Sequence, residues 1–111
     1  MYLPKPQNTA WQTNQEINLK RCAVLVIDLL GGSLGNIPAL DGAVKNAVSI
    51  VDKARELNIP VIFSCDAHIK GLDKELELWG EHGIKGTEAA KPLDVFHVTE
   101  KDYIVPKRRY S

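Results

Sequence analysis

Cys22-Ala-Val-Leu-Val-Ile-Asp28 is the stretch that decides the fold, because it is continuous, apolar and rich in β-branched residues. Such a run is typical of a strand that is buried on both faces in a parallel sheet. A second apolar run, Pro60-Val-Ile-Phe-Ser-Cys-Asp66, predicts another short strand. Between the two runs, a loop is indicated by Gly31, Gly32 and Gly35.

The segment that links the two runs predicts a helix, because apolar residues recur at helical spacing from Leu40 to Ala54. Asp41 is the expected N-cap, and Asn58 is the expected C-terminal stop. Strand, helix and strand form a βαβ unit, which predicts an α/β fold with a parallel sheet. Further along, the pattern predicts a short helix over 72–79, a helical turn from 87, and strands over 95–98 and 103–105.

The composition of the 111 residues predicts one domain, preceded by a polar arm over residues 1–19. Fourteen Lys and Arg balance fourteen Asp and Glu, which argues against nucleic acid or an anionic membrane as the partner. The longest apolar run is far shorter than the ~20 residues of a membrane helix, and the first residues do not resemble a secretory signal. Two cysteines do not make a disulfide framework, so we expect a reduced, cytoplasmic protein.

Each of the three clearest strands ends in a charged residue, namely Asp28, Asp66 or Lys107. Ligands of an open parallel sheet bind beyond the carboxyl ends of its strands. A carboxylate at such a place is costly to desolvate unless it has a partner or a function. These three residues are therefore candidates for a site, although each by itself can simply mark the point where a strand reaches water.

A second group of candidates consists of Asp66, His68, Glu75 and His82. Carboxylate and imidazole are suitable ligands for a divalent ion such as zinc, which we favour, or manganese or iron. Three protein ligands with open positions would suit a catalytic rather than a structural metal. The alternative is a solvated acidic helix with surface histidines.

Four further features have ordinary interpretations. His97 lies in a strand-like run and is expected to be a core or edge histidine. Cys65 is expected to be a small apolar filler at a strand end. The loop from Gly31 to Gly35 matches neither the dinucleotide-binding pattern nor the P-loop. The basic run at Lys107 is too short to indicate nucleic-acid binding.

Four motifs, in this order, resemble those of the isochorismatase-like cysteine hydrolases. They are Val26-Ile-Asp28, Asp66-Ala-His68, Trp79-Gly-Glu-His-Gly-Ile-Lys-Gly-Thr87 and Lys107-Arg-Arg-Tyr-Ser111. The metal-type spacing is most similar to that of the nicotinamidases in this superfamily. The resemblance covers residues 20–111 and implies a Rossmann-like parallel sheet with an Asp, Lys and Cys triad.

The resemblance also implies a role for each matching residue. Asp28 would be the general base that takes the thiol proton, and Lys107 would stabilise the thiolate and the charge that develops on the substrate. Asp66, His68 and His82, with Glu75 among or beside the ligands, would match the metal site of nicotinamidases, where the ion binds the pyridine nitrogen. A thiol with a pKa of about 8.5 needs such a base and cation to attack at neutral pH.

Two departures from the family's pattern shape the functional hypothesis. The loop after Asp28 reads Leu29-Leu-Gly-Gly-Ser33, where the family has Asn or Asp followed by an aromatic residue. The family's nucleophilic cysteine lies beyond the Lys motif, and neither Cys22 nor Cys65 can replace it by sequence order. We therefore expect residues 20–111 to be the N-terminal part of one hydrolase domain. A second polypeptide would carry the remaining strands and the cysteine, and an oligomer would result.

Three functions remain open on the sequence. The first is an amidohydrolase that converts a small amide, such as nicotinamide, to the acid and ammonia once the second polypeptide is present. The second is a metal-independent hydrolase of the isochorismatase type. The third is a truncated, non-catalytic assembly module. Convergence of Asp66, His68 and His82 on one point would favour the first over the second.

Overall fold

The computed structural model describes residues 17–32 and 37–109 of the chain. Residues 1–16, 33–36 and 110–111 lie outside the described part. Most of the predicted arm over residues 1–19 therefore falls outside it. Among the described residues, no helix is long and apolar enough to cross a membrane.

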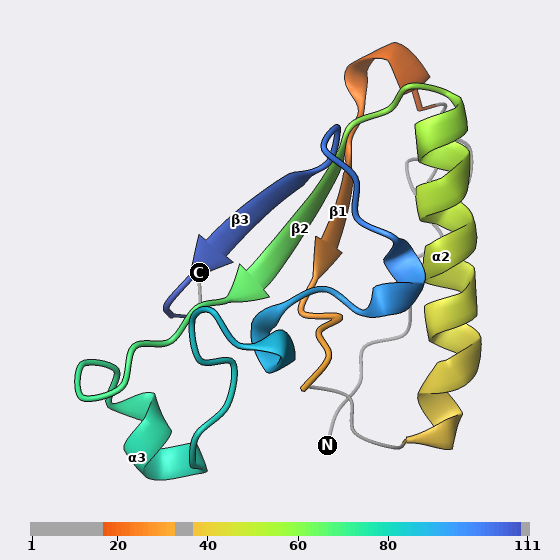
Figure 1. Ribbon diagram of the computed structural model, residues 1–111. Helices are drawn as coiled ribbons and strands as arrows, with labels where there is room; N and C mark the ends of the chain where they lie inside the picture. The colour runs from red at the N-terminus through yellow and green to blue at the C-terminus, as the bar shows by residue number, and fades with distance from the viewer. Residues whose placement is uncertain (1–16, 33–36, 110–111) are drawn as a thin grey trace, which may run out of the picture.

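Three parallel strands form one open sheet in the order β1-β2-β3 (Figure 1). They are β1 (Val24–Ile27), β2 (Val61–Asp66) and β3 (Tyr103–Lys107). The helices are α2 (Asp41–Glu56) and α3 (Glu75–Trp79), with 3-10 turns η1 (Leu19–Arg21), η2 (Pro38–Leu40), η3 (Glu88–Ala90) and η4 (Asp94–Phe96). The predicted α/β fold with a parallel sheet is confirmed, and β2 lies at its centre.

Helix α2 begins one residue earlier than its predicted cap implies. Leu40 is the N-cap, and Asp41 is the first helical residue. The negative charge of Asp41 stabilises the helix there, because it lies at the positive end of the helix dipole. The helix ends at Glu56, and Asn58 follows in a left-handed conformation with φ of 57°. Asparagine tolerates this conformation better than most residues, which explains why it terminates the helix as predicted.

The core lies between one face of the sheet and the helical segments packed on it. Helix α2 packs on β1, β2 and η4, and buries Val51 and Ala54. Phe63 of β2 meets Phe96 of η4 edge to face, with ring centroids 5.4 Å apart. The buried cluster is completed by Val26, Leu30, Val61 and Cys65.

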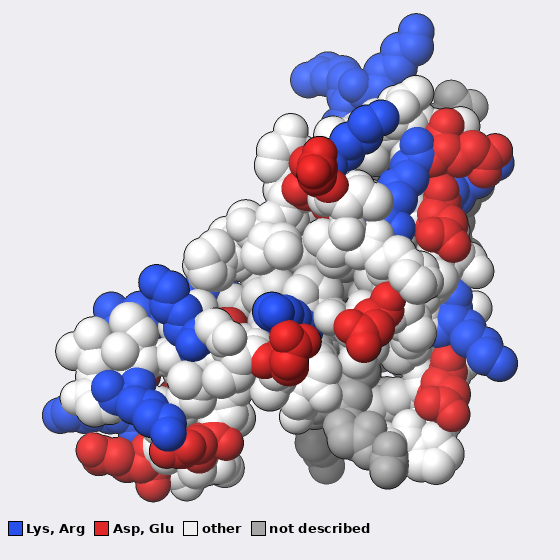
Figure 2. Space-filling view, in the orientation of Figure 1, with Lys and Arg blue, Asp and Glu red and all other residues white. Residues whose placement is uncertain are grey.

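The opposite face of the sheet is largely uncovered in the described part of the chain. Leu25 and Ile27 are 56% and 55% exposed, so the prediction of a strand buried on both faces is wrong for β1. The register places Tyr103 and Val105 of β3 on the same face, where they are 59% and 50% exposed. Figure 2 shows a largely uncharged area where β3 lies, with charged side chains gathered along α2 and the α3 segment.

The predicted strand over 95–98 is wrong. The segment forms η4, and His97 follows it with φ of 45° and an exposed side chain. The backbone nitrogen of His97 donates to the carbonyl of Asp94 and closes a turn. A short apolar run does not distinguish strand from turn, and here the burial of Phe96 against Phe63 decides the outcome. His97 is consequently neither a core nor a strand-edge histidine.

Helix α3 is shorter than the predicted 72–79. It begins at Glu75, and Gly80, with φ of 79°, ends it at the predicted place. The predicted helical turn from Thr87 is only the 3-10 turn η3.

Candidate active site

Lys107 lies between the two carboxylates that follow β1 and end β2. Its Nζ is 2.9 Å from Oδ1 of Asp28 as an ion pair, and donates a hydrogen bond to Oδ2 of the same residue at 3.2 Å. Nζ also lies 3.1 Å from Oδ1 of Asp66. The parallel register produces this contact, because Asp66 of β2 is the direct partner of Lys107 of β3. The structure therefore brings the three charged strand ends together.

Asp28 leaves the sheet in an unusual backbone conformation. Its nitrogen still donates to the carbonyl of Ser64 at 3.1 Å, but its φ is 58°. A positive φ at a residue other than glycine is uncommon, and clusters at functional sites. The side chain of Asp28 is 41% exposed, so a reacting group can approach it from solvent.

The loop after Asp28 is held by the segment before η4. Leu93 N donates to the carbonyl of Leu29, and Gly31 N donates to the carbonyl of Lys91. Gly32 N donates to the carbonyl of Ala89, and a Cβ on Gly32 would lie only 2.5 Å from Cβ of Ala89. The glycines thus allow two backbones to approach closely.

Lys107 stays cationic at neutral pH. Burial by itself would lower the pKa of this amine, but hydrogen bonds to Asp28 and Asp66 outweigh burial and raise the pKa above its usual value. Cys65 behaves oppositely to a nucleophile, because burial and the neighbouring Asp28 and Asp66 raise the pKa of its thiol. The geometry agrees with the interpretation of Cys65 as a filler.

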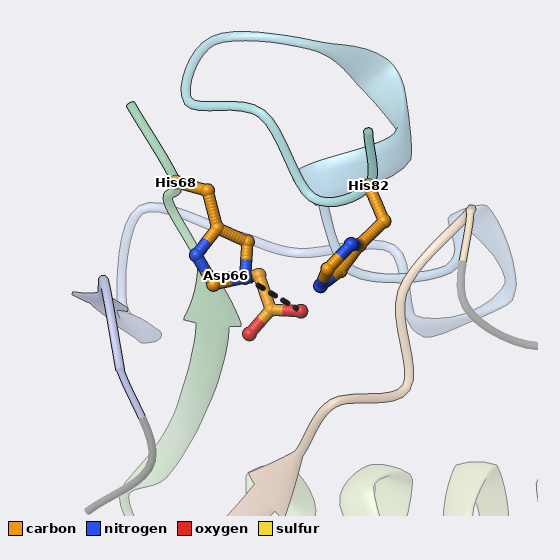
Figure 3. A group of neighbouring side chains, drawn as sticks. All are labelled: Asp66, His68 and His82. Atoms are coloured by element: carbon orange, nitrogen blue, oxygen red, sulfur yellow. Dashed lines mark ion pairs between the residues drawn. The ribbon is translucent and has the colours of Figure 1, made fainter. Parts of the chain in front are cut away.

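Asp66, His68 and His82 each offer one ligand atom, and these atoms lie within 4.8 Å of one another. Figure 3 shows the two imidazole rings and the carboxylate facing one space, with Asp66 and His68 from the end of β2 and His82 from the facing loop. A parallel bridge between His68 and Ile84 holds that loop in place. His68 N donates to the carbonyl of Gly83 at 2.9 Å, which sets His82 beside Asp66.

Glu75 contacts both histidines from helix α3. Its Oε1 is 3.1 Å from Nε2 of His68 and 3.0 Å from Nε2 of His82. Nδ1 of His82 lies 2.9 Å from the carbonyl of Gly80, which only accepts, so this nitrogen carries a proton. The hydrogen bond to Gly80, together with Glu75 and Asp66, raises the pKa of His82 despite its partial burial.

This donor set fits a divalent metal ion. Two Nε2 atoms and carboxylate oxygens meet at one point, and such nitrogen and oxygen donors suit zinc, manganese or iron. The hydrogen bond from His82 to Gly80 is the outer contact that commonly orients a ligating imidazole. Nδ1 of His68 is buried and has no such partner in the described part of the chain.

All six predicted site residues line one cavity of about 180 Å³. Larger hollows of about 690 Å³ beside the start of α2, and about 620 Å³ at the other end of the sheet, contain none of these residues. Chemistry rather than size therefore identifies the candidate site. Arg109 also lines the small cavity, and sequence reasoning had treated it only as part of a short basic run. Its place two residues after Lys107, inside the same motif, was the available signal.

The sequence matches the Isochorismatase domain family over residues 22–111. The chain therefore belongs to the isochorismatase domain family, as the four motifs implied. None of the curated proteins that were compared matches it.

Several solved structures share this fold. N-carbamoylsarcosine amidase from Thermoplasma acidophilum is 26% identical, with a TM-score of 0.72 over 80% of this chain and 53% of that chain. The pyrazinamidase of Pyrococcus horikoshii in complex with zinc is 17% identical, with a TM-score of 0.66 over 79% and 52%. Nicotinamidase from Bacillus subtilis is 21% identical, with a TM-score of 0.63 over 80% and 56%. The chain spans about half the length of these structures, and the last two similarities concern the fold alone.

Proposed function

We propose that this chain carries part of an amidohydrolase active site that converts a small amide, such as nicotinamide, to the acid and ammonia. The observation that carries the proposal is the position of Asp66. Its carboxylate contacts Lys107 on one side, and belongs to the group with His68 and His82 on the other. An acid, an amine and a set of metal-ligand atoms thus share one small cavity.

In this proposal Asp28 is the general base, because its side chain is 41% exposed and a thiol that enters the cavity can reach it. It takes the thiol proton, and the cationic Lys107 stabilises the thiolate and the charge on the amide oxygen. The thiolate adds to the amide carbon. The carbon–nitrogen bond then breaks, and ammonia leaves with the proton held by Asp28. Water hydrolyses the thioester to the acid and restores the thiol.

We propose that the thiol belongs to a part of the domain that lies outside these 111 residues. Cys65 is buried with a raised pKa, and Cys22 precedes β1, at the far end of that strand from Asp28. The solved relatives are about twice as long as the matched region, which is consistent with further strands. The uncovered face at Leu25 and Ile27 offers apolar surface on which the rest of the domain can pack.

We further propose that Asp66, His68 and His82 hold a divalent ion, zinc first, with Glu75 among or beside the ligands. When bound, the ion would supply a Lewis acid that holds and orients a ring nitrogen of the substrate. Convergence of the three side chains supports this proposal over the metal-independent, isochorismatase-type alternative.

The test is ammonia release from nicotinamide by the native protein that includes the part of the domain carrying the thiol, loaded with zinc. Asp28→Asn and Lys107→Met should each lower kcat by about 100-fold or more, because general base and charge stabilisation are lost. Lys101→Met, an exposed lysine before β3, should leave the rate unchanged. If no small amide releases ammonia while metal is bound and the thiol is present, a non-catalytic assembly module becomes the better description.

Two other expectations stay predictions. A cytoplasmic location is supported by the free thiols of Cys22 and Cys65. An oligomer is supported by the exposed apolar face of the sheet.

A further inference from the structure

Asp73 is a buried acid that the proposed chemistry does not use. Its side chain is only 3% exposed, yet both carboxylate oxygens have partners. Oδ2 accepts a hydrogen bond from the backbone nitrogen of Ile69 at 2.7 Å. Arg108 donates from Nη2 to Oδ1 at 2.7 Å, and from Nε to both oxygens at 3.2 and 3.3 Å. This is a two-nitrogen contact of the kind that fixes orientation as well as distance.

Asp73 and its two partners connect three parts of the site. Ile69 directly follows His68, and Arg108 directly follows Lys107. Asp73 itself lies two residues before Glu75, which begins α3. A helix of five residues is too short to be stable alone, so the place of Glu75 depends on an anchor outside the helix. The contacts of Asp73 supply that anchor.

We propose, on the basis of the function proposed above, that Asp73 and Arg108 are positioning residues for the metal-type cluster. They hold the α3 segment so that Oε1 of Glu75 stays within 3.1 Å of both histidines. They also fix that segment to the end of β3, where Lys107 contacts Asp66. The guanidinium fork is essential, because a lysine ammonium is a point charge that does not set orientation.

A second buried Arg–Asp ion pair in the chain serves as a matched control. It distinguishes positioning of the metal-type cluster from general stabilisation of the fold. Arg55 of α2 binds Asp102 through Nη2 at 2.6 Å and Nε at 3.4 Å, and the side chain of Asp102 is also 3% exposed. This pair lies beside the start of β3, at the end of the sheet away from the site. Loss of either pair should destabilise the fold, but only one pair touches segments that carry candidate ligands.

The first readout is the zinc affinity of the full chain, measured by competition with a chelator. Asp73→Asn and Arg108→Gln should each weaken binding by about 10- to 100-fold, the range for residues that support metal ligands. The double variant should lose no more than either single variant, because one contact is removed. Arg108→Lys should recover little of the loss. Asp102→Asn should lower the unfolding temperature and leave zinc affinity unchanged.

The second readout needs no metal. His68 and His82 have ring centroids 4.7 Å apart, which should give NMR contacts between the two rings. These contacts should disappear in Asp73→Asn and persist in Asp102→Asn. Arg108→Lys is the milder variant, to be used if Asp73→Asn does not fold, and in it the contacts should weaken. Zinc affinity and ring contacts that match those of Asp102→Asn would overturn the positioning role. If the unaltered chain binds no zinc, the metal proposal fails, and the ring contacts alone decide the positioning role.

Discussion

Lys107 is in contact with two carboxylates at once, and its removal should expose their mutual repulsion. Lys107→Met keeps an apolar stem of similar length but leaves Asp28 and Asp66 without their cation. We expect the free energy of unfolding to fall by about 1–3 kcal/mol at pH 7. Urea unfolding at pH 7 measures this effect.

Lys101→Met is the control for that measurement, since Lys101 is exposed. Its effect should stay within about 0.5 kcal/mol. An equally small effect of Lys107→Met would show that the contacts of Lys107 with the two carboxylates do not stabilise the fold.

Asp73 should determine part of the acid stability of the fold. The hydrogen bond from Arg108, with that from Ile69, lowers the pKa of this carboxyl to about 2, below the value of about 3.9 in an unfolded chain. A lowered pKa gives stability that is present above about pH 4 and is lost as the pH falls toward 2. The free energy of unfolding should therefore fall less steeply between pH 4 and 2 in Asp73→Asn.

Glu77→Gln, on the exposed side of α3, should keep the slope of the unaltered protein. An unchanged slope in Asp73→Asn would mean that its ion pair does not form in solution.

At the scale of elements, the loop after β1 depends on close backbone approach. A Cβ at Gly32 would lie 2.5 Å from Cβ and 3.1 Å from Cα of Ala89, so one of the two paired segments must move. We expect Gly32→Ala to lower the free energy of unfolding by about 1–3 kcal/mol, the usual cost of overpacking. Thermal or urea unfolding checks this value.

Gly42 provides the opposite case. It lies in α2 and a Cβ there would meet nothing within 4 Å, so Gly42→Ala should stabilise by about 0.5–1 kcal/mol through helix propensity. If Gly32→Ala and Gly42→Ala changed the free energy of unfolding in the same direction, the close approach of Gly32 to Ala89 would not explain the effect of Gly32→Ala.

The elements were largely predictable from the sequence, and the wrong prediction over 95–98 has a physical cause. Helix α2 and strands β2 and β3 follow the predicted patterns, because spacing and capping are local properties. The segment 95–98 became a turn because Phe96 alone finds a partner, in Phe63, more than thirty residues earlier. The local residue pattern does not predict a contact between two residues so far apart in the sequence.

For the whole molecule, the uncovered face of the sheet should govern behaviour in solution. Leu25 and Ile27 of β1, with Tyr103 and Val105 of β3, are exposed on one face, on either side of β2. We expect the chain alone to bind a hydrophobic dye and to self-associate in sedimentation velocity. The double variant Leu25→Gln with Ile27→Gln should reduce both, while stability changes by no more than about 0.5 kcal/mol per site, because these side chains are already exposed.

Ile50→Gln is the matched control, because Ile50 is 57% exposed on α2. Dye binding and association should persist in that variant. A chain that stays monomeric and binds no dye would contradict the assignment of this face as a contact surface.

The sequence by itself determined the α/β class, the family and the residues at the strand ends. Apolar strand runs and the order of motifs are local features, which can be recognised from neighbouring residues. The catalytic and metal roles of those residues stay predictions. Only the tertiary structure decided that Glu75 lies between two histidines, that Asp73 binds Arg108, and that one face of β1 stays open. These features depend on distances between segments far apart in the chain, which only packing and strand register set.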